Sequence, residues 1–411
     1  MSPPGSNKSG MRGAPLPDSA RPLPTVRSMN STSPFRLPPP ASGRVDLLVI
    51  AGEHSGDQHA ATLVRDLRAQ RPGVSVVALG GPALAQAGAQ LLHDLTASSV
   101  VGLVEVLKNY PFFKALFEET LRWIAEHRPR AICFVDYPGL NLRLAKALRE
   151  RGLSVKGGGE IQLLYYISPQ IWAWKAKRRF TMARDLDALA VIFPFEVECY
   201  ADTTLPVEFV GHPFLDEAHV APVRYDPAGP ILLLPGSRKQ AVGRIFPLLL
   251  AGHAAYAKTG NRDAVVLYPS ELIKTVLLAE KLPANVKLLP TGMPVAASAV
   301  LTSSGTMSMH CALAAIPGAV VYRANPITYL LGRWLVKVPY LGIANLLLKA
   351  PMYPEFIQGA ASPAALAGQL TACLRNIERL IATQTQAEQL RSLLRRPAGG
   401  TVADWVLRKM G

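Results

Sequence analysis

The sequence predicts an α/β protein with two Rossmann-like domains that face each other across a cleft. Short runs of Val, Ile and Leu alternate with segments of helical pattern from residue 45 onward, and the alternation starts again after Pro213. Continuous apolar strands separated by helices are typical of a parallel sheet covered on both faces. Ligands bind beyond the carboxyl ends of the strands in such sheets, so the loops there are where chemistry is expected.

The composition fits a folded protein with an anionic partner. The chain has 411 residues, of which 49% are hydrophobic and 18% charged, enough for two substantial cores. Lys and Arg number 44 against 29 acidic residues, which gives a net charge of +15. The charge suggests nucleic acid, a nucleotide, phospholipid or a membrane surface as partner, and its sign does not choose among them.

Cysteines and apolar runs indicate the compartment. Four cysteines lie far apart without a CxxC pair or a histidine cluster, which argues against a zinc site or disulfides and favours a reducing compartment. No apolar run reaches the roughly 18 residues needed to cross a bilayer, and the first residues lack the apolar core of a signal peptide. We expect a cytoplasmic protein that touches a membrane.

The sequence divides into five segments. Residues 1–44 are rich in proline and basic side chains, bury too little apolar surface to fold, and are expected to be a disordered tail. Residues 45–213 form the first domain, residues 214–230 a proline-containing linker, and residues 231–369 the second domain. Residues 370–411 are expected to be helices that either cross back to the first domain or exchange with a partner subunit.

Nine buried strands are expected from the apolar runs. They are Val45–Ile50, Ser75–Leu79, Ala131–Val135, Leu163–Ile167, Leu189–Phe193, Ile231–Leu234, Ala264–Tyr268, Ala299–Thr302 and Ala319–Tyr322.

Acidic residues follow two of the first-domain strands. After the first strand, Ser55 is expected to cap a helix, with Glu53 and Asp57 near its N-terminus, and these acids either serve chemistry or simply suit the helix dipole. Asp136 directly follows another strand. It is placed either for general-base work or as an N-cap of the next helix.

Aromatic and basic residues gather after the fourth strand. Trp172 and Trp174 are followed by Lys177, Arg178 and Arg179. This pattern indicates either a surface for an amphipathic anionic ligand, nucleic acid included, or core aromatics followed by a solvated basic helix.

A second apolar stretch spans residues 102–123 and includes Phe112 and Phe113. Its polar positions do not form one clean face. The stretch therefore indicates either core packing or a membrane-apposed or acyl-binding helix pair.

The second domain carries two loops suited to phosphate. Gly236, Ser237 and Arg238 follow one strand, where glycine allows close backbone approach and arginine supplies a forked positive charge. The segment from Ser304 through Gly305 to Thr306 follows another strand and opens a helix. Two such loops in one domain favour a nucleotide diphosphate.

Two further residues occupy later turns, and a third lies at the domain junction. Arg323 and Glu355 are candidates for the nucleotide, although Glu355 after a proline also suits the first turn of a helix. His212 lies at the domain junction, where a single histidine is most often structural, and we assign it no proton transfer.

The motifs also occur in a characteristic order. They are Ala51-Gly52-Glu53-x-Ser55-Gly56-Asp57, Asp136-x-Pro138-x-x-Asn141, Ser168-Pro169-x-x-Trp172-Ala173-Trp174, Phe193-Pro194-Phe195-Glu196, Phe209-Val210-Gly211-His212-Pro213, Leu234-Pro235-Gly236-Ser237-Arg238, Ser304-Gly305-Thr306 and Val320-Val321-Tyr322-Arg323. In this order and spacing they resemble the lipid-A-disaccharide synthases, which are glycosyltransferases of the two-domain GT-B architecture. The resemblance covers roughly residues 45 to 369.

The resemblance implies a reaction. A 2,3-diacylglucosamine unit would pass from UDP, with inversion, to 2,3-diacylglucosamine 1-phosphate, giving a β-1,6-linked disaccharide 1-phosphate and UDP. It implies no metal, no cofactor and no nucleic acid. It also implies work at the cytoplasmic face of the inner membrane, to which the protein would bind peripherally, and we leave open a homodimer.

The resemblance assigns roles to residues by their place in the motifs. Asp136 would be the general base, with Glu53 and Asp57 near it. The nucleotide would lie against the residues Gly236, Ser237, Arg238, Ser304, Gly305, Thr306, Arg323, Asn345 and Glu355. From their apolar and basic character, and not from the motifs, we expect the acyl chains and the membrane to meet the residues Trp172, Trp174, Lys177, Arg178, Arg179, Phe112 and Phe113.

The chain departs from the family pattern at several positions. Ala241 and His310 stand where the family usually has glutamate, and His54 and Leu140 replace a small residue and a phenylalanine. We expect His310 to change how the donor nucleotide is oriented.

Two other classes of protein remain open at this point. Another GT-B UDP-sugar enzyme, such as an epimerase or a transferase with a soluble acceptor, would share the nucleotide loops. A non-catalytic binder of anionic lipid would explain the charge and the aromatics without needing Asp136.

Overall fold

The computed structural model describes residues 35–99, 110–216, 219–325, 329–330, 338–397 and 400–411. The chain separates into residues 1–36 and residues 37–411, and both sheets belong to the latter.

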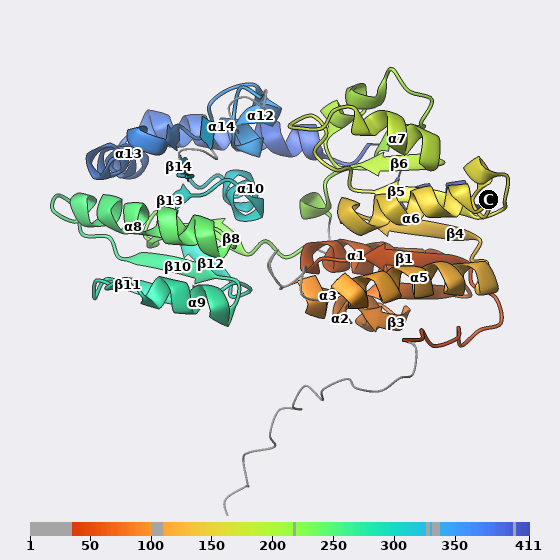
Figure 1. The fold of residues 1–411 in the computed structure, drawn as a ribbon. Helices are drawn as coiled ribbons and strands as arrows, with labels where there is room; N and C mark the ends of the chain where they lie inside the picture. Colours follow the sequence, from red (N-terminus) through yellow and green to blue (C-terminus); the bar gives the residue numbers. More distant parts are fainter. Residues whose placement is uncertain (1–34, 100–109, 217–218, 326–328, 331–337, 398–399) are drawn as a thin grey trace, which may run out of the picture. The chain divides into compact units, whose positions relative to one another are not determined.

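The first sheet has seven parallel strands and its own helices (Figure 1). The strands are β1 Leu47–Ala51, β2 Val76–Gly80, β3 Gln90–Asp94, β4 Ala131–Val135, β5 Gln162–Tyr166, β6 Ala188–Val191 and β7 Val207–Phe209. The helices are α1 His54–Gln70, α2 Pro82–Gln86, α3 Thr96–Ser99, α5 Tyr110–His127, α6 Pro138–Glu150 and α7 Arg178–Asp185, with the 3₁₀ turns η1 Val155–Gly157, η2 Pro194–Glu196, η3 Glu198–Tyr200 and η4 Pro213–Leu215. The spatial order is β3-β2-β1-β4-β5-β6-β7.

The second sheet has six parallel strands in the order β11-β10-β9-β13-β14-β15. Its strands are β9 Ile231–Leu234, β10 Ala264–Tyr268, β11 Val286–Pro290, β13 Ala299–Thr302, β14 Gly318–Tyr322 and β15 Glu355–Ile357. The helices are α8 Lys239–Tyr256, α9 Glu271–Leu278, α10 Thr306–Leu313, α12 Ile343–Leu348, α13 Pro363–Arg375 and α14 Ile377–Leu394, with the turn η5 Gln358–Ala360. A separate pair joins β8 Val223–Tyr225 to β12 Val295–Ala297, so the predicted linker contains a strand.

The two predicted parallel sheets are confirmed. Every residue of β1, β4, β9 and β13 is buried, as expected for strands covered on both faces. All nine expected strands are present, with ends shifted by no more than two residues. Six of the described strands were not expected, namely β3, β7, β8, β11, β12 and β15. They are short or contain polar residues, and β3, β7, β11 and β15 lie at sheet edges.

The contacts of the first sheet begin before Val45, the predicted start of the domain. Leu37 is buried, and its N–H donates to Glu119 of α5. The indole of Trp123 donates to the Pro38 carbonyl. The proline-rich segment from Leu37 is therefore part of the fold, because it covers the end of α5.

The C-terminal helix α15 Val402–Met410 packs on the first sheet. Trp405 and Val406 are fully buried in the cluster that contains β1 and α1. The preceding helix α14 packs instead into the second core through Leu390 and Leu394. Within this chain α15 thus lies on the first sheet, and exchange with a partner subunit stays a prediction.

Candidate active site

Two acidic residues follow neighbouring strands of the first sheet. β1 and β4 pair in parallel, with Ala51 opposite Val135. Asp136 follows β4 directly and Glu53 lies just beyond β1, so both extend from the same edge. Burial and the negative charge of Glu53 raise the pKa of Asp136 to about 6, although a backbone N–H at Tyr137 acts in the opposite direction. A carboxylate that titrates near neutral pH is suited to general-base work.

The backbone at Asp136 is held in an uncommon conformation. Asp136 and Tyr137 both have positive φ, 48° and 50°, which costs conformational energy for residues other than glycine. Asn141 Nδ2 and the Tyr165 hydroxyl both donate to the Asp136 carbonyl, at 2.7 and 2.6 Å. These two bonds fix the backbone of Asp136. Asp136 is not the N-cap of α6, because Tyr137 occupies that position and no side chain caps the helix.

Gly52 makes room for the ring of Tyr137. A β-carbon built at Gly52 would lie 2.1 Å from Cδ1 of Tyr137, far inside contact distance. The aromatic ring of one loop therefore lies directly on the other. This contact requires glycine at position 52 and links the loop of Glu53 to the loop of Asp136.

Asp57 is fully buried and already has its partners. Its Oδ1 accepts from the N–H groups of Gly81 and Leu84, at 2.7 and 3.3 Å, and its Oδ2 accepts from Ala83 at 3.0 Å. Asp57 thus joins α1 to the start of α2. The expected cap at Ser55 is wrong, because Glu53 occupies the N-cap position and no side chain caps the helix.

Glu196 belongs to the same region, although no role was predicted for it from the sequence. It is 1% exposed. Its oxygens accept from the Trp172 indole at 3.3 Å and from the N–H of Phe193 at 3.2 Å. Burial, with a smaller effect of Asp136, raises the pKa of Glu196 to about 8. An acid inside the apolar Phe-Pro-Phe-Glu run was the signal that could have revealed it.

The two phosphate-type loops of the second sheet lie together. β9 and β13 are neighbours, with Leu234 opposite Thr302. Gly236 has φ 107°, and a β-carbon there would lie 3.0 Å from Oγ of Ser303. The loops are followed by α8 and α10, whose first N–H groups and dipoles favour an anion. The predicted residues in them are exposed, namely Ser237, Arg238, Ser304, Gly305 and Thr306.

Glu355 and Asn345 organise the start of α12. Glu355 accepts from the N–H groups of Leu341 and Gly342 and from Asn345 Nδ2, each of these partners lying 2.9 Å from one of its oxygens. Ser304 Oγ donates to the Leu341 carbonyl at 2.7 Å, which connects this network to the second phosphate-type loop. Glu355 begins β15, so the alternative of a helix first turn is wrong.

Arg323 lies beyond the end of β14 and is exposed. The next residue, Ala324, exchanges two hydrogen bonds with the Gln358 side chain, at 2.8 and 3.2 Å. The loop that carries Arg323 is thereby held at the carboxyl edge of the second sheet.

The aromatic and basic residues after β5 form a surface. Trp174 is 49% exposed, with Lys175 Nζ 4.4 Å and Arg178 Cζ 5.9 Å from its ring centroid. Lys177 is exposed, whereas Arg179 is paired with Asp202 through two bonds of 2.6 Å. Core packing is therefore wrong for Trp174, while Trp172 is partly buried against Phe195.

Phe112 and Phe113 lie in the first turn of α5. Their rings meet edge to face at 5.8 Å and are partly buried. Residues 100–109, which carry much of the proposed membrane-apposed helix pair, lie outside the described part of the chain. No described helix combines the length and apolar character needed to cross a bilayer.

His310, which replaces a family glutamate, is buried in α10. It lines a pocket of about 350 Å³ together with Gln58 of α1, Phe214 and the predicted nucleotide residue Thr306. Elements that belong to the first and to the second sheet's domain thus line one pocket. His310, which replaces the family glutamate, is part of that lining.

No metal-type cluster is found in the described ranges. No three His, Cys, Asp or Glu side chains there are grouped to hold an ion. The four cysteines, all in the described ranges, are free thiols.

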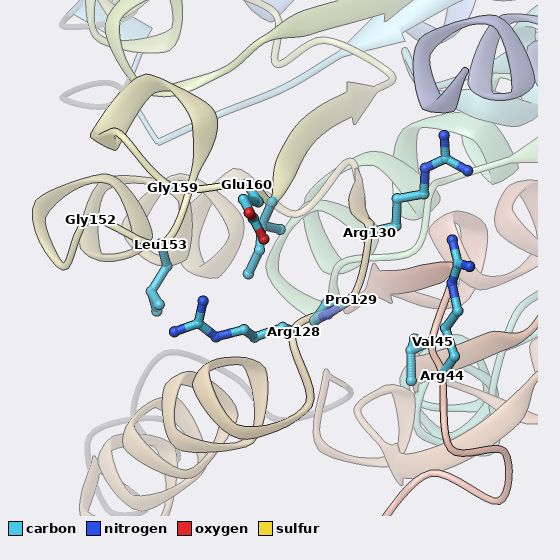
Figure 2. A pocket seen from close by; sticks show the side chains of 10 residues that line it. Arg44, Val45, Arg128, Pro129, Arg130, Gly152, Leu153, Gly159 and Glu160 are labelled. Atoms are coloured by element: carbon cyan, nitrogen blue, oxygen red, sulfur yellow. The ribbon is translucent and has the colours of Figure 1, made fainter.

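Another pocket, of about 250 Å³, lies at the opposite edge of the first sheet (Figure 2). Val45 precedes β1, Arg130 precedes β4 and Glu160 precedes β5, so the pocket is at the amino ends of the strands. The acids described above are at the carboxyl ends. We therefore do not assign the reaction to this pocket.

Solved structures with a similar arrangement of sheets indicate the architecture to which the chain belongs. A glycosyltransferase of kitacinnamycin aligns with a TM-score of 0.60 at 15% identity, over 90% of this chain and 100% of that structure. A putative UDP-N-acetylglucosamine 2-epimerase from Listeria monocytogenes aligns with a TM-score of 0.59 at 12% identity, over 89% and 95%. Two parallel Rossmann-like sheets make up the GT-B architecture. A protein named as a glycosyltransferase and one named as an epimerase share it, so the fold alone does not distinguish these activities.

Sequence comparison is more specific. The family model for lipid-A-disaccharide synthetase matches residues 47–400. The lipid-A-disaccharide synthase of Nitrosococcus oceani is 33% identical over 371 residues, covering 87% of this chain and 94% of that protein. The chain belongs to the lipid-A-disaccharide synthase family, and it is a glycosyltransferase.

Proposed function

We propose that the chain transfers 2,3-diacylglucosamine from UDP to 2,3-diacylglucosamine 1-phosphate, forming a β-1,6-linked disaccharide 1-phosphate and UDP. The observation that carries the proposal is Asp136, an acid with a pKa raised to about 6 at the carboxyl edge of the first sheet. Membership of the family supports a transferase over the other two classes, since the fold alone is shared with an epimerase.

In this proposal Asp136 takes the proton of the acceptor hydroxyl. Asn141 and Tyr165 fix its backbone, which limits the positions that the carboxylate can reach. Glu53 tunes the acid through its charge. Asp57 acts indirectly, because all its contacts are to the start of α2.

The departing diphosphate needs positive partners. The proposed transfer uses no metal or cofactor, so Arg238, Arg323 and the N–H groups of the two loops meet the developing charge. Each such preorganised donor is typically worth about 3–4 kcal/mol in the transition state. Asn345 and Glu355 contribute by fixing α12 beside Ser304.

The acceptor and the membrane are proposed to meet the first domain. Trp174 with Lys175 and Arg178 offers apolar surface and positive charge, which suit an anionic lipid and the cytoplasmic face of the inner membrane. Phe112 and Phe113 add to the apolar surface, and nucleic acid is not invoked. The homodimer stays a prediction.

The test is release of UDP. Purified full-length protein is incubated with UDP-2,3-diacylglucosamine, with and without 2,3-diacylglucosamine 1-phosphate. We expect UDP release only when the acceptor is present, with one disaccharide formed per UDP. Equal UDP release without acceptor, or isomerisation of the sugar, would contradict the proposal, and Asp136→Asn serves as the inactive control.

A further inference from the structure

An apolar pocket of about 670 Å³ adjoins the candidate site. Its walls come from the loop after β5, the turn η2, helix α12 and the last turn of α14. Among the residues that line it are Trp172, Phe195, Leu346, Leu347, Lys349 and Leu393. Lys349, the charged member, is exposed at the end of α12.

The walls of this pocket are held in place. The Trp172 ring meets Phe195 edge to face at 5.5 Å, and its indole N–H donates to the buried Glu196. Leu347 is 8% exposed and belongs to the second core. The pocket is therefore built from fixed side chains, and its volume lies in the range of small-molecule sites.

The pocket is continuous with the residues proposed for the donor. Helix α12 carries Leu346 and Leu347 next to Asn345, whose amide donates to Glu355 at 2.9 Å. On the other side, Glu196 links Trp172 to the neighbourhood of Asp136. An apolar ligand here would lie against the helix that carries Asn345 and against Trp172, the hydrogen-bond partner of Glu196.

We propose that this pocket binds a fatty acyl chain of the sugar-nucleotide donor. The inference rests on the proposed function. An open apolar pocket leaves its lining without packing partners, and a chain of methylene groups supplies them. We assign the chain to the donor because α12 and α14 pack with the second core, whose loops are the proposed nucleotide site.

The experiment combines pocket-filling variants with donors of different acyl length. Leu346→Trp and Leu393→Trp place bulk in the pocket from two helices, and Leu278→Trp, at a 57% exposed position of α9, is the matched control. For the unmodified chain and the control, each donor methylene removed should raise the donor KM by roughly fourfold while the methylene is within the pocket. In the two pocket variants this dependence should disappear.

The outcomes separate the two proposals. If the unmodified chain releases no acceptor-dependent UDP, the proposed function fails. If it is active but both pocket variants keep the full dependence on donor length, only the pocket assignment fails. The pocket assignment would also be overturned if the pocket variants lost the dependence on acceptor length instead. The same holds if their activity fell by the same factor with donors of every acyl length. Thermal unfolding of each variant identifies misfolding, and Leu346→Ser then repeats the test without added bulk.

Discussion

The ring of Phe214 stacks on the imidazole of His310, with centroids 3.8 Å apart. His219 also stacks on His310 at 5.2 Å, and His212 meets Phe214 edge to face at 4.5 Å. Phe214 follows the last strand of the first sheet, whereas His310 belongs to α10 of the second. A cluster of aromatic and imidazole rings therefore connects the junction to the helix of the second nucleotide loop.

This cluster, which His59 joins with its ring 6.1 Å from that of Phe214, predicts loss of stability in acid. Burial, and the nearness of the other histidines, lower the pKa of His212 to about 3 and those of His59 and His310 to about 4. The unfolded chain protonates these groups near 6.5, so between pH 6.5 and about 4 it binds more protons than the folded chain. The free energy of unfolding should therefore fall as the pH falls through that window, which urea titrations at several pH values measure.

The variant His310→Gln should flatten this pH dependence. Each pKa unit of depression corresponds to about 1.4 kcal/mol, so removing one histidine should recover a measurable share of the loss below pH 6. His54→Gln, at an exposed position, is the control and should keep the original slope. An unchanged slope in His310→Gln would remove this residue from the explanation.

Replacing Asp136 should separate activity from stability. Burial and Glu53 raise its pKa to about 6, so above that pH its charge destabilises the folded state. Asp136→Asn should lose turnover by several orders of magnitude. At pH 8 its free energy of unfolding should nevertheless be higher than that of the unmodified chain, by about 1–3 kcal/mol. A variant that retains turnover would exclude Asp136 as the base.

Glu53 should influence the pH at which kcat falls on the acidic side, because that fall reports the titration of Asp136. Because the charge of Glu53 raises the pKa of Asp136, Glu53→Gln should move the acidic limb of kcat to lower pH. The measurement is kcat between pH 5 and 9 for both proteins. A limb that stays in place would mean that another group controls it.

Asp57 should matter for folding. It accepts three backbone hydrogen bonds at the start of α2 while fully buried. Asp57→Asn replaces one accepting oxygen with a donor and should lower the free energy of unfolding by about 2–4 kcal/mol. Asp202→Asn, which removes an exposed partner of Arg179, is the control and should change it by less than about 1 kcal/mol.

The basic residues beside Trp174 should bind anionic membranes. Lys177→Glu with Arg178→Glu should reduce sedimentation with phosphatidylglycerol vesicles at low salt, because each basic residue near such a surface contributes about 1 kcal/mol. The matched control, Lys258→Glu with Lys281→Glu, makes the same change in net charge at exposed positions of the second domain. Equal partition of both double variants would count against membrane contact at Trp174.

The two sheets and the loops at the ends of their strands were predictable from local sequence pattern. β4, β9, β10 and β13 match their expected ranges residue for residue, because continuous apolar runs must be buried on both faces wherever they lie. The positions of Asp136, Gly236 and Ser304 at strand ends follow from the same local pattern.

Which side chains these loops bring together became visible only in the folded chain. The bonds of Asp57 to Gly81 and Ala83, the burial of Glu196 under Trp172, and the return of α15 to the first sheet all join distant parts of the chain. Such contacts depend on packing and on the dielectric environment that packing creates. Local hydrophobic pattern, which sets the strands, carries no information about either.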